Sequence, residues 1–342
     1  MKNSNLKDRF LDTLLGKGPD PGEKIPVLSV TQTGTVDLMQ KTGAFWPEAH
    51  SNPEKMATLA LAAHEITGLE AARYPYCVTV LSEALGCKVR KGSQALQPYV
   101  ISHPLEVGKR VPEIPEDLLN RGRIPTVLKA GRLLKTKTGD SLPLIAGIES
   151  PASITTKLMG GDKYMKCLLK DPAYVRECLA VNTEIVIEYA NALLDSGADA
   201  VCMPDGVSSP ELLSPALFEN FIKPVYGKFC REVKGIKIIH MCGDATPFLK
   251  TLSECGFAGI SVEEKVRDLK RAKEEIGKGA VLIGNVSTAS TLLSGTPREV
   301  KAEAKSCLEG GIGILAPGCG IAPLTPVENM RALVEARNEY YS

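Results

Sequence analysis

Short apolar segments alternate with longer amphipathic segments along most of the chain. The apolar segments are rich in branched aliphatic residues, which is typical of strands buried on both faces of a parallel sheet. Eight strands are predicted, at residues 25–30, 69–76, 143–149, 199–205, 236–242, 258–264, 280–286 and 312–318. The longer segments repeat apolar residues at the spacing of amphipathic helices. They predict helices at residues 53–68, 172–195, 215–233, 246–255, 266–276, 297–309 and 326–339.

The alternation predicts parallel strands joined by crossover helices. Eight repeats favour a closed (β/α)8 TIM barrel, with an open doubly wound sheet as the alternative. An amphipathic helix from about Ser4 is expected as an N-terminal extension before the first strand. Residues 77–142 break the rhythm with short alternating pieces and Pro-rich connections, and predict an insertion of short antiparallel strands after the second strand. We therefore expect one barrel domain over residues 1–342, with this insertion.

The composition narrows the class of protein. A net charge of +1 over 342 residues provides no bulk attraction to nucleic acid or to an anionic membrane surface. The N-terminal segment has no apolar core of signal-peptide length, and no run reaches the ~18 apolar residues of a membrane span. Ten cysteines are too few for a secreted disulfide scaffold, so most should be reduced. These features lead us to expect a cytoplasmic protein.

Polar residues lie at the carboxyl ends of most of the predicted strands. In a (β/α)8 barrel these ends surround one opening, here called the mouth, where the chemistry takes place. The residues are, in chain order, Glu149, Asp205, His240 with Cys242, Glu263 with Glu264, Asn285 and Cys319. Side chains far apart in the sequence are therefore predicted to converge on one site, where Asp205 and Asn285 are candidates for contacting a cofactor.

His240 and Cys242 are two residues apart on an extended segment, so their side chains share a face. An imidazole and a thiolate together favour zinc among the common metals. Cys319 is the candidate for a third ligand, because it lies between two glycines where the backbone can turn sharply. Taken alone, the His-x-Cys pair has a second interpretation, in which both side chains simply pack in the hydrophobic core. The strand-end position and the glycine-flanked Cys319 favour the metal site.

Two acidic residues at the mouth have both a functional and a structural interpretation. Glu263 is a candidate fourth, displaceable metal ligand, or an acid that only favours the start of the following helix. Asp205 either caps the turn after its strand or supports the metal ligands or the substrate. The remaining cysteines are predicted to pack in the core, at positions 77, 87, 167, 178, 202, 230, 255 and 307. The remaining histidines are predicted to be structural or exposed, at positions 50, 64 and 103.

Three protein ligands leave one position open, which is the arrangement of a catalytic zinc. Two thiolates and a neutral imidazole cancel the charge of the ion, so it would activate water poorly. Such a site suits the binding of a substrate thiol, which is held as a nucleophilic thiolate. Alkyl transfer to a thiol is therefore the reaction that fits best, and metal-assisted hydrolysis is second.

Six segments carry a family resemblance that spans nearly the whole sequence: IIHMCGDATPFL (238–249), SVEEKVRDLKRAK (261–273), VLIGNVST (281–288), ILAPGCGIAPLTPVENMRALVEA (314–336), PLIAGIESPASI (143–154) and residues 10–27. With them the chain resembles the uroporphyrinogen decarboxylase superfamily, and its metal residues resemble the methylcobalamin:coenzyme M methyltransferase branch from methanogenic archaea. The decarboxylase branch has an arginine-rich segment after its first strand, whereas this chain has SVTQTGTVDLMQ (29–40), without arginine.

The resemblance implies zinc on His240, Cys242 and Cys319, with the thiol of coenzyme M (2-mercaptoethanesulfonate) in the open position. Methylcobalamin, carried by a separate corrinoid protein, would donate the methyl group, and methyl-coenzyme M and cob(I)alamin would be formed. Arg73, at the end of the second predicted strand, and backbone amides are candidates for binding the sulfonate. The alternatives are a zinc alkyltransferase with another thiol or donor, a decarboxylase-like enzyme, and a non-catalytic zinc-binding subunit.

Overall fold

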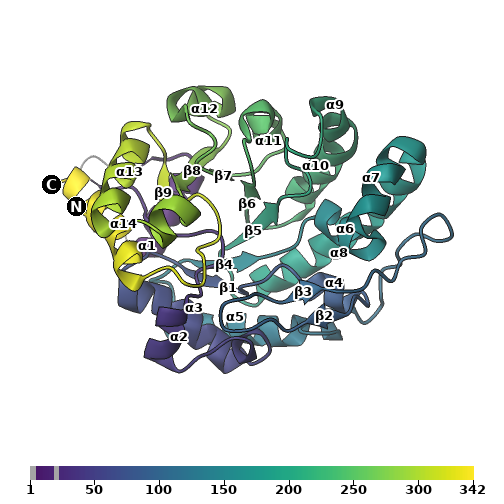
Figure 1. Ribbon diagram of the computed structural model, residues 1–342, viewed down its shortest axis with the longest axis horizontal. Coiled ribbons are helices and arrows are strands. Elements are labelled where there is room, and N and C mark those ends of the chain that lie inside the picture. Colours follow the sequence, from purple (N-terminus) through teal and green to yellow (C-terminus); the bar gives the residue numbers. More distant parts are fainter. Residues whose placement is uncertain (1–4, 19–22) are drawn as a thin grey trace.

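The computed structural model describes residues 5–18 and 23–342 of the chain. A curled parallel sheet occupies the centre of the molecule, and helices surround it (Figure 1). Seven strands are hydrogen-bonded in chain order: β1 (Ala72–Tyr74), β4 (Leu144–Gly147), β5 (Ala200–Asp205), β6 (Ile236–Met241), β7 (Gly259–Val262), β8 (Val281–Val286) and β9 (Ile314–Pro317). This arrangement is the predicted TIM-barrel-like (β/α)8 fold.

The first predicted strand, residues 25–30, is extended but is not a regular strand. It lies between β9 and β1, where Leu315 exchanges backbone hydrogen bonds with Pro26 and Leu28 at 2.9 and 3.0 Å. On its other side the amide of Glu70 donates to the carbonyl of Val27 at 2.8 Å. The Val27 amide bonds the Glu70 carboxylate instead of a backbone carbonyl, and Pro26 has no N–H to donate. The segment therefore takes the eighth place in the barrel without a full ladder.

The helices that follow the strands form the outer layer of the barrel (Figure 1). The predicted helices are all present, some divided into two or three parts. The α-helices are α1 (Leu6–Leu14), α2 (Val36–Thr42), α3 (Pro53–Thr67), α4 (Val80–Ala84), α5 (Ile124–Thr138), α6 (Pro151–Met159), α7 (Gly161–Lys170), α8 (Pro172–Asp195), α9 (Pro215–Leu217), α10 (Lys223–Glu232), α11 (Leu249–Glu254), α12 (Leu269–Ile276), α13 (Pro297–Glu309) and α14 (Val327–Tyr340). Short 3-10 or π segments lie at Glu48–His50, Leu118–Asn120, Phe218–Ile222, Thr246–Phe248 and Thr288–Leu293.

The insertion after the second predicted strand is shorter than the sequence suggested. The expected antiparallel pair is present as β2 (Val89–Arg90) and β3 (Tyr99–Val100). The prediction of strands for the rest of residues 77–142 was wrong, because α5 occupies 15 residues of it and is the crossover helix between β1 and β4. Its buried residues recur at helical spacing, at Ile124, Val127, Ala130, Gly131 and Leu134. A proline near the start, a glycine and many polar residues weaken that pattern in the sequence.

Helix α1 closes the end of the barrel opposite the mouth. Its Phe10 and Leu14 pack among inward-facing residues of the strands, including Ile145, Ile238 and Ile283. The predicted start of this helix at Ser4 lies outside the described residues, and within them the helix begins at Leu6. No helix among the described residues is both long and apolar enough to span a membrane.

Candidate metal centre at the barrel mouth

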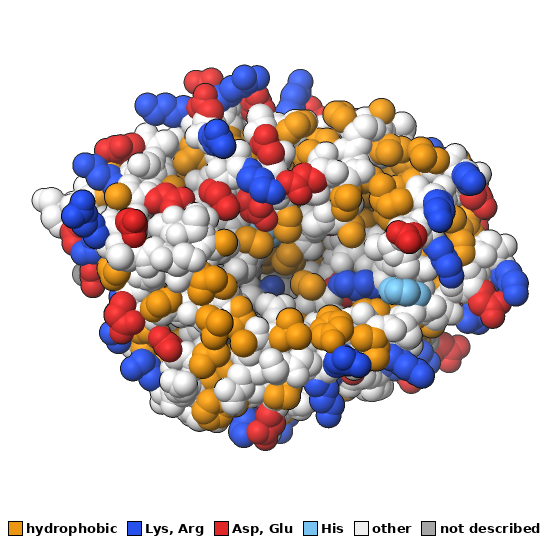
Figure 2. Space-filling view, viewed as in Figure 1, with side chains coloured by type: hydrophobic (Ala, Val, Ile, Leu, Met, Phe, Trp, Pro, Cys, Tyr) orange, Lys and Arg blue, Asp and Glu red, His pale blue; other side chains and the backbone are white. Residues whose placement is uncertain are grey.

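The loops that follow the strands surround a hollow in the middle of one face of the molecule (Figure 2). His240 lies near the end of β6, Cys242 just after it, Glu263 just after β7, and Cys319 two residues after β9. Each of the four offers one ligand atom, and these atoms all lie within 4.8 Å of one another. The structure thus brings together the four residues that the sequence singled out as metal ligands.

The imidazole of His240 is oriented by a neighbour on the next strand. Its Nδ1 lies 3.1 Å from the hydroxyl oxygen of Ser261, which is its register partner on β7. Its Nε2 faces the sulfur of Cys242 at 3.6 Å. A hydrogen bond at one ring nitrogen fixes the tautomer of a metal-binding histidine and leaves the other nitrogen for the ion. Ser261 is thus a supporting residue that the sequence analysis did not identify, and its signal is an inward-facing hydroxyl beside His240.

The two thiols of the site compete for one proton. A hydrogen bond from Cys242 holds the pKa of Cys319 below the usual thiol range, and that contact, with burial, raises the pKa of Cys242. Burial, and then the negative charge of Cys319, raise the pKa of the half-buried Glu263. A cation bound among these groups would relieve the repulsion and release their protons. The electrostatics therefore favour binding of a positive ion.

The loop of Cys319 is held by the segment that follows the first predicted strand. The hydroxyl of Thr31 donates to the carbonyl of Cys319 at 2.9 Å, and the amide of Ile321 donates to the carbonyl of Gln32 at 3.0 Å. These contacts join residues almost 300 positions apart, so no local spacing in the sequence could have indicated them. They fix the third candidate ligand relative to the rest of the barrel.

Asn285 lies at the mouth, but its side chain is used by the protein itself. The amide nitrogen donates to the carbonyls of Glu263 and Val266, both at 2.9 Å, and the oxygen accepts from the thiol of Cys307 at 3.3 Å. Asn285 therefore positions the loop that carries Glu263. Its predicted contact with a cofactor stays a prediction.

Asp205 is completely buried, and its contacts are those of the turn cap that the sequence analysis gave as one of two alternatives. Its carboxylate accepts hydrogen bonds from the amide and hydroxyl of Ser208, both at 2.9 Å, and from the hydroxyl of Tyr226 at 2.5 Å. Its backbone carbonyl accepts from the amide of Cys242 at 3.3 Å. Asp205 thus caps its turn and holds the backbone of a candidate metal ligand. A direct role with a cofactor stays a prediction.

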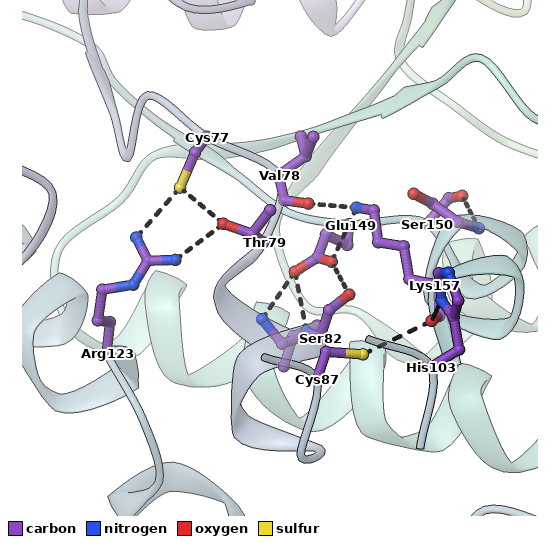
Figure 3. Close-up of polar contacts among 12 residues, drawn as sticks. Cys77, Val78, Thr79, Ser82, Cys87, His103, Arg123, Glu149, Ser150 and Lys157 are labelled. Carbon is purple, nitrogen blue, oxygen red and sulfur yellow. Dashed lines mark hydrogen bonds and ion pairs between the residues drawn. The ribbon is translucent and has the colours of Figure 1, made fainter. Parts of the chain in front are cut away.

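Glu149, at the end of the predicted strand 143–149, is not among the metal donors. Figure 3 shows its carboxylate at the start of α4, where it accepts from the amides of Leu81 and Ser82 at 2.7 and 3.3 Å. It also forms an ion pair with Lys157 at 3.0 Å. Glu149 therefore anchors the beginning of the insertion to the barrel.

A second polar cluster, outside the metal donors, surrounds Cys77. Figure 3 shows the Arg123 guanidinium directed at the sulfur, with Nη1 at 3.2 Å, and the Thr79 hydroxyl at 3.4 Å. Burial alone would raise the pKa of this thiol, but the charge of Arg123 and the contact with His50 outweigh burial and lower the pKa to about 6. Cys77 lies in the core, as predicted from the sequence, and its lowered pKa makes it an ion-paired thiolate at neutral pH.

The Cys77 thiolate predicts a pH-dependent contribution to stability. The thiol has a lower pKa in the folded protein than in the unfolded chain, so its contribution is present above about pH 9 and is lost as the pH falls through about 6. From pH 7 to 8.5 the stability of the wild type relative to Cys77→Ala should grow by about 2 kcal/mol. Denaturant unfolding across this range measures the difference.

Cys255→Ala is the matched control for this experiment. Burial raises the pKa of Cys255 to about 12, so its thiol stays neutral in the folded protein. The difference between wild type and this variant should stay constant between pH 7 and 8 and shrink above that. A constant difference for Cys77→Ala over the same range would contradict the thiolate assignment.

Comparison with known proteins shows the family of the chain. Residues 5–340 match the family described as uroporphyrinogen decarboxylase (URO-D). The chain is 46% identical over the full length of both sequences to methylcobamide:CoM methyltransferase MtaA of Methanosarcina barkeri. It is 36% identical to methylcobamide:CoM methyltransferase MtbA of Methanosarcina mazei, over 94% of each chain.

Among solved structures, a methyltransferase from Methanosarcina mazei matches with a TM-score of 0.96 and 48% identity, over 99% of each chain. A full-length match at this identity shows a common family as well as a common fold. The chain therefore belongs to the uroporphyrinogen decarboxylase (URO-D) family, and within it to the group of the methylcobamide:CoM methyltransferases.

Proposed function

We propose that the protein is a zinc-dependent methyltransferase that moves a methyl group from methylcob(III)alamin to the thiol of coenzyme M. The carbon–cobalt bond breaks and its electron pair stays on cobalt, while the thiolate sulfur forms the new bond to carbon. The products are methyl-coenzyme M and cob(I)alamin. The names of the MtaA and MtbA relatives support the two substrates. The observation that carries the proposal is the convergence of one imidazole and two thiols at the mouth.

The donor set fits zinc. Neighbouring ligand atoms of a tetrahedral site with bonds of about 2.0–2.3 Å lie about 3.6 Å apart, and the His240 and Cys242 donors are 3.6 Å apart. Imidazole and thiolate are ligands that zinc prefers, and carboxylate-loving ions such as Mg²⁺ and Ca²⁺ do not select them. His240, Cys242 and Cys319 would hold the ion. Bound there, zinc would lower the pKa of the substrate thiol and so supply the thiolate at neutral pH.

The protein's own side chains would keep the bound thiolate reactive. Cys242 and Cys319 would bring two negative charges, which balance the charge of the zinc ion. The substrate sulfur would therefore keep its electron density. Ser261 holds His240 in one orientation, and Thr31 holds the Cys319 loop. The ligands would thus be preorganised before the substrate arrives, which lowers the cost of binding and orienting it.

We further propose that Glu263 occupies the fourth position when no thiol is present and leaves when the thiol binds. Burial and the charge of Cys319 raise the pKa of this carboxyl, so it gains from a nearby cation and accepts a proton readily once displaced. A zinc-bound structure without thiol, showing only water at the fourth position, would contradict this role.

The methyl-bearing corrinoid is proposed to arrive on a separate protein. The family match takes up residues 5–340, so these residues hold no second domain for carrying a cobalamin. The hollow at the mouth would be the place where that carrier presents its methyl group (Figure 2).

The test uses the purified, zinc-loaded protein with free methylcobalamin. Loss of the methylcobalamin absorbance, one zinc per chain and formation of methyl-coenzyme M are expected. The same assay with other thiols separates coenzyme M from another acceptor. If no thiol produces cob(I)alamin, the proposed function is wrong, whatever the zinc content.

A further inference from the structure

Arg73 is a buried cation that no carboxylate of the described residues 5–18 and 23–342 pairs with. It lies on β1, its side chain is about 1% exposed, and its Nη1 has no hydrogen-bond partner. Its Nε donates a hydrogen bond to the carbonyl of Val30 at 3.3 Å. Among the described residues, the other buried arginine, Arg337, is paired with Glu70, and the half-buried Arg123 is paired with Glu83. An unpaired buried guanidinium is costly to the folded protein, so its presence calls for an explanation.

The groups around the guanidinium do not neutralise it. The ionisable side chains that act on Arg73 are those of Cys202, Cys77, Tyr76 and Tyr189. Burial raises the pKa of Cys202 to about 12, so this thiol is neutral at physiological pH. The Cys77 thiolate is already engaged by the Arg123 Nη1 at 3.2 Å. A negative charge for Arg73 must therefore come from outside the chain.

Arg73 lies close to the candidate metal ligands. Val30, whose carbonyl accepts from Arg73, is followed directly by Thr31, whose hydroxyl donates to the carbonyl of Cys319 at 2.9 Å. Adjacent residues are about 3.8 Å apart between Cα atoms. Arg73 is therefore hydrogen-bonded to Val30 and Cys319 to the next residue, Thr31, which places the two close together.

The fold also leaves room for the guanidinium on the inner face of the next strand. Gly147, near the mouth end of β4, has no side chain, and a Cβ there would lie 1.9 Å from the Arg73 Nη2. The register partner of Arg73 is Ile145, so the guanidinium extends two residues further toward the mouth than its own Cα. The side chain is thus directed along the barrel interior toward the opening.

We propose that Arg73 binds the anionic end of the thiol substrate, the sulfonate of coenzyme M, while its thiol end lies at His240, Cys242 and Cys319. This inference rests on the proposed function and adds the residue that makes the enzyme specific for one class of thiol. Only two carbon atoms separate the thiol from the sulfonate, so the anion must be bound close to the metal ligands. A planar guanidinium provides paired N–H donors for such an anion. Arg73 would then select anionic thiols over neutral ones.

The test compares coenzyme M with 2-mercaptoethanol, which has the same carbon chain and no charge. In zinc-loaded Arg73→Met, kcat/KM for coenzyme M should fall about 100-fold, mainly through KM, because a buried charge pair is lost. The value for 2-mercaptoethanol and the zinc content should stay near wild type. Arg73→Lys, which keeps the charge, should recover part of the selectivity.

A second readout does not depend on turnover. Ethanesulfonate, which has the sulfonate but no thiol, should raise the melting temperature of the wild type and not that of Arg73→Met. Without ligand, Arg73→Met should melt at or above the wild-type temperature, because the variant removes an unpaired buried charge. Arg123→Met is the control: its arginine is paired, so the variant should lose stability and keep the wild-type ratio of the two thiols.

Two results would overturn the assignment. They are a wild-type ratio of kcat/KM for the two thiols in Arg73→Met, whether or not both values fall, and stabilisation of that variant by ethanesulfonate. If the wild type methylates neither thiol, the proposed function fails, and the ethanesulfonate melting experiment decides the role of Arg73 separately. If Arg73→Met does not fold, Gly147→Ala replaces it, since the new Cβ would displace the guanidinium and should produce the same change in selectivity.

Discussion

Replacing Cys319 by alanine is expected to remove the bound zinc and to lower the rate of methyl transfer about 1,000-fold or more. Loss of a residue that merely supports a metal ligand costs about 10- to 100-fold, and a ligand should cost more. The remaining donors, His240, Cys242 and Glu263, would include a single sulfur. Metal analysis after dialysis and the spectroscopic assay of methylcobalamin loss measure the two effects.

Cys167→Ala is the matched control. Cys167 has a similar, intermediate exposure but lies on α7, away from the metal donors. This variant should keep its zinc and its rate. The Cys319 variant should still fold, because its thiol lies in a loop and fills no core position. Full zinc occupancy and an undiminished rate in Cys319→Ala would exclude this residue as a ligand.

Replacing Glu70 by alanine is expected to destabilise the protein by about 3–5 kcal/mol, the usual cost of breaking a buried ion pair from one side. The Glu70 carboxylate contacts Arg337 of α14 at 2.5 Å and Arg9 of α1 at 2.7 Å, and accepts from the amide of Val27 at 3.0 Å. It therefore ties both ends of the described chain to the place where the barrel closes. Removing it leaves two guanidinium groups and one amide without this partner.

The loss should lower the melting temperature by about 4–7 °C in calorimetry or circular dichroism. Glu54→Ala is the control, since its ion pair with Lys129 is exposed and should change the midpoint by no more than about 1 °C. The zinc content of the folded Glu70 variant should stay at the wild-type value. Equal shifts in the two variants would show that the buried pair does not hold the closure together.

The metal donors could be predicted from the sequence because they follow strands. Once the alternation of strands and helices is recognised, the ends of parallel strands must meet, and His240, Cys242, Glu263 and Cys319 all lie just there. The period of two along a strand also placed His240 and Cys242 on one face. These inferences need only local spacing and the geometry of the barrel.

What the sequence did not reveal depends on contacts between distant segments. The bonds of Thr31 to Cys319 and of Ser261 to His240 arise only when separate strands lie side by side. The turn-capping role of Asp205 was left open for the same reason. Helix α5 was missed on other grounds: its core-facing stripe contains Ala130 and Gly131, which bury little apolar surface and carry a weak hydrophobic signal.

Closure of the barrel at the end opposite the mouth has a consequence for the order in which the substrates bind. Because Phe10 and Leu14 fill that end, the small thiol and the bulky corrinoid carrier of the proposed reaction share the mouth as their entrance. A carrier seated over the mouth would block the path of the thiol to the bottom of the hollow. Turnover should therefore follow a compulsory order, with the thiol first and the carrier second. An excess of methylated carrier would then inhibit the reaction at low thiol concentration.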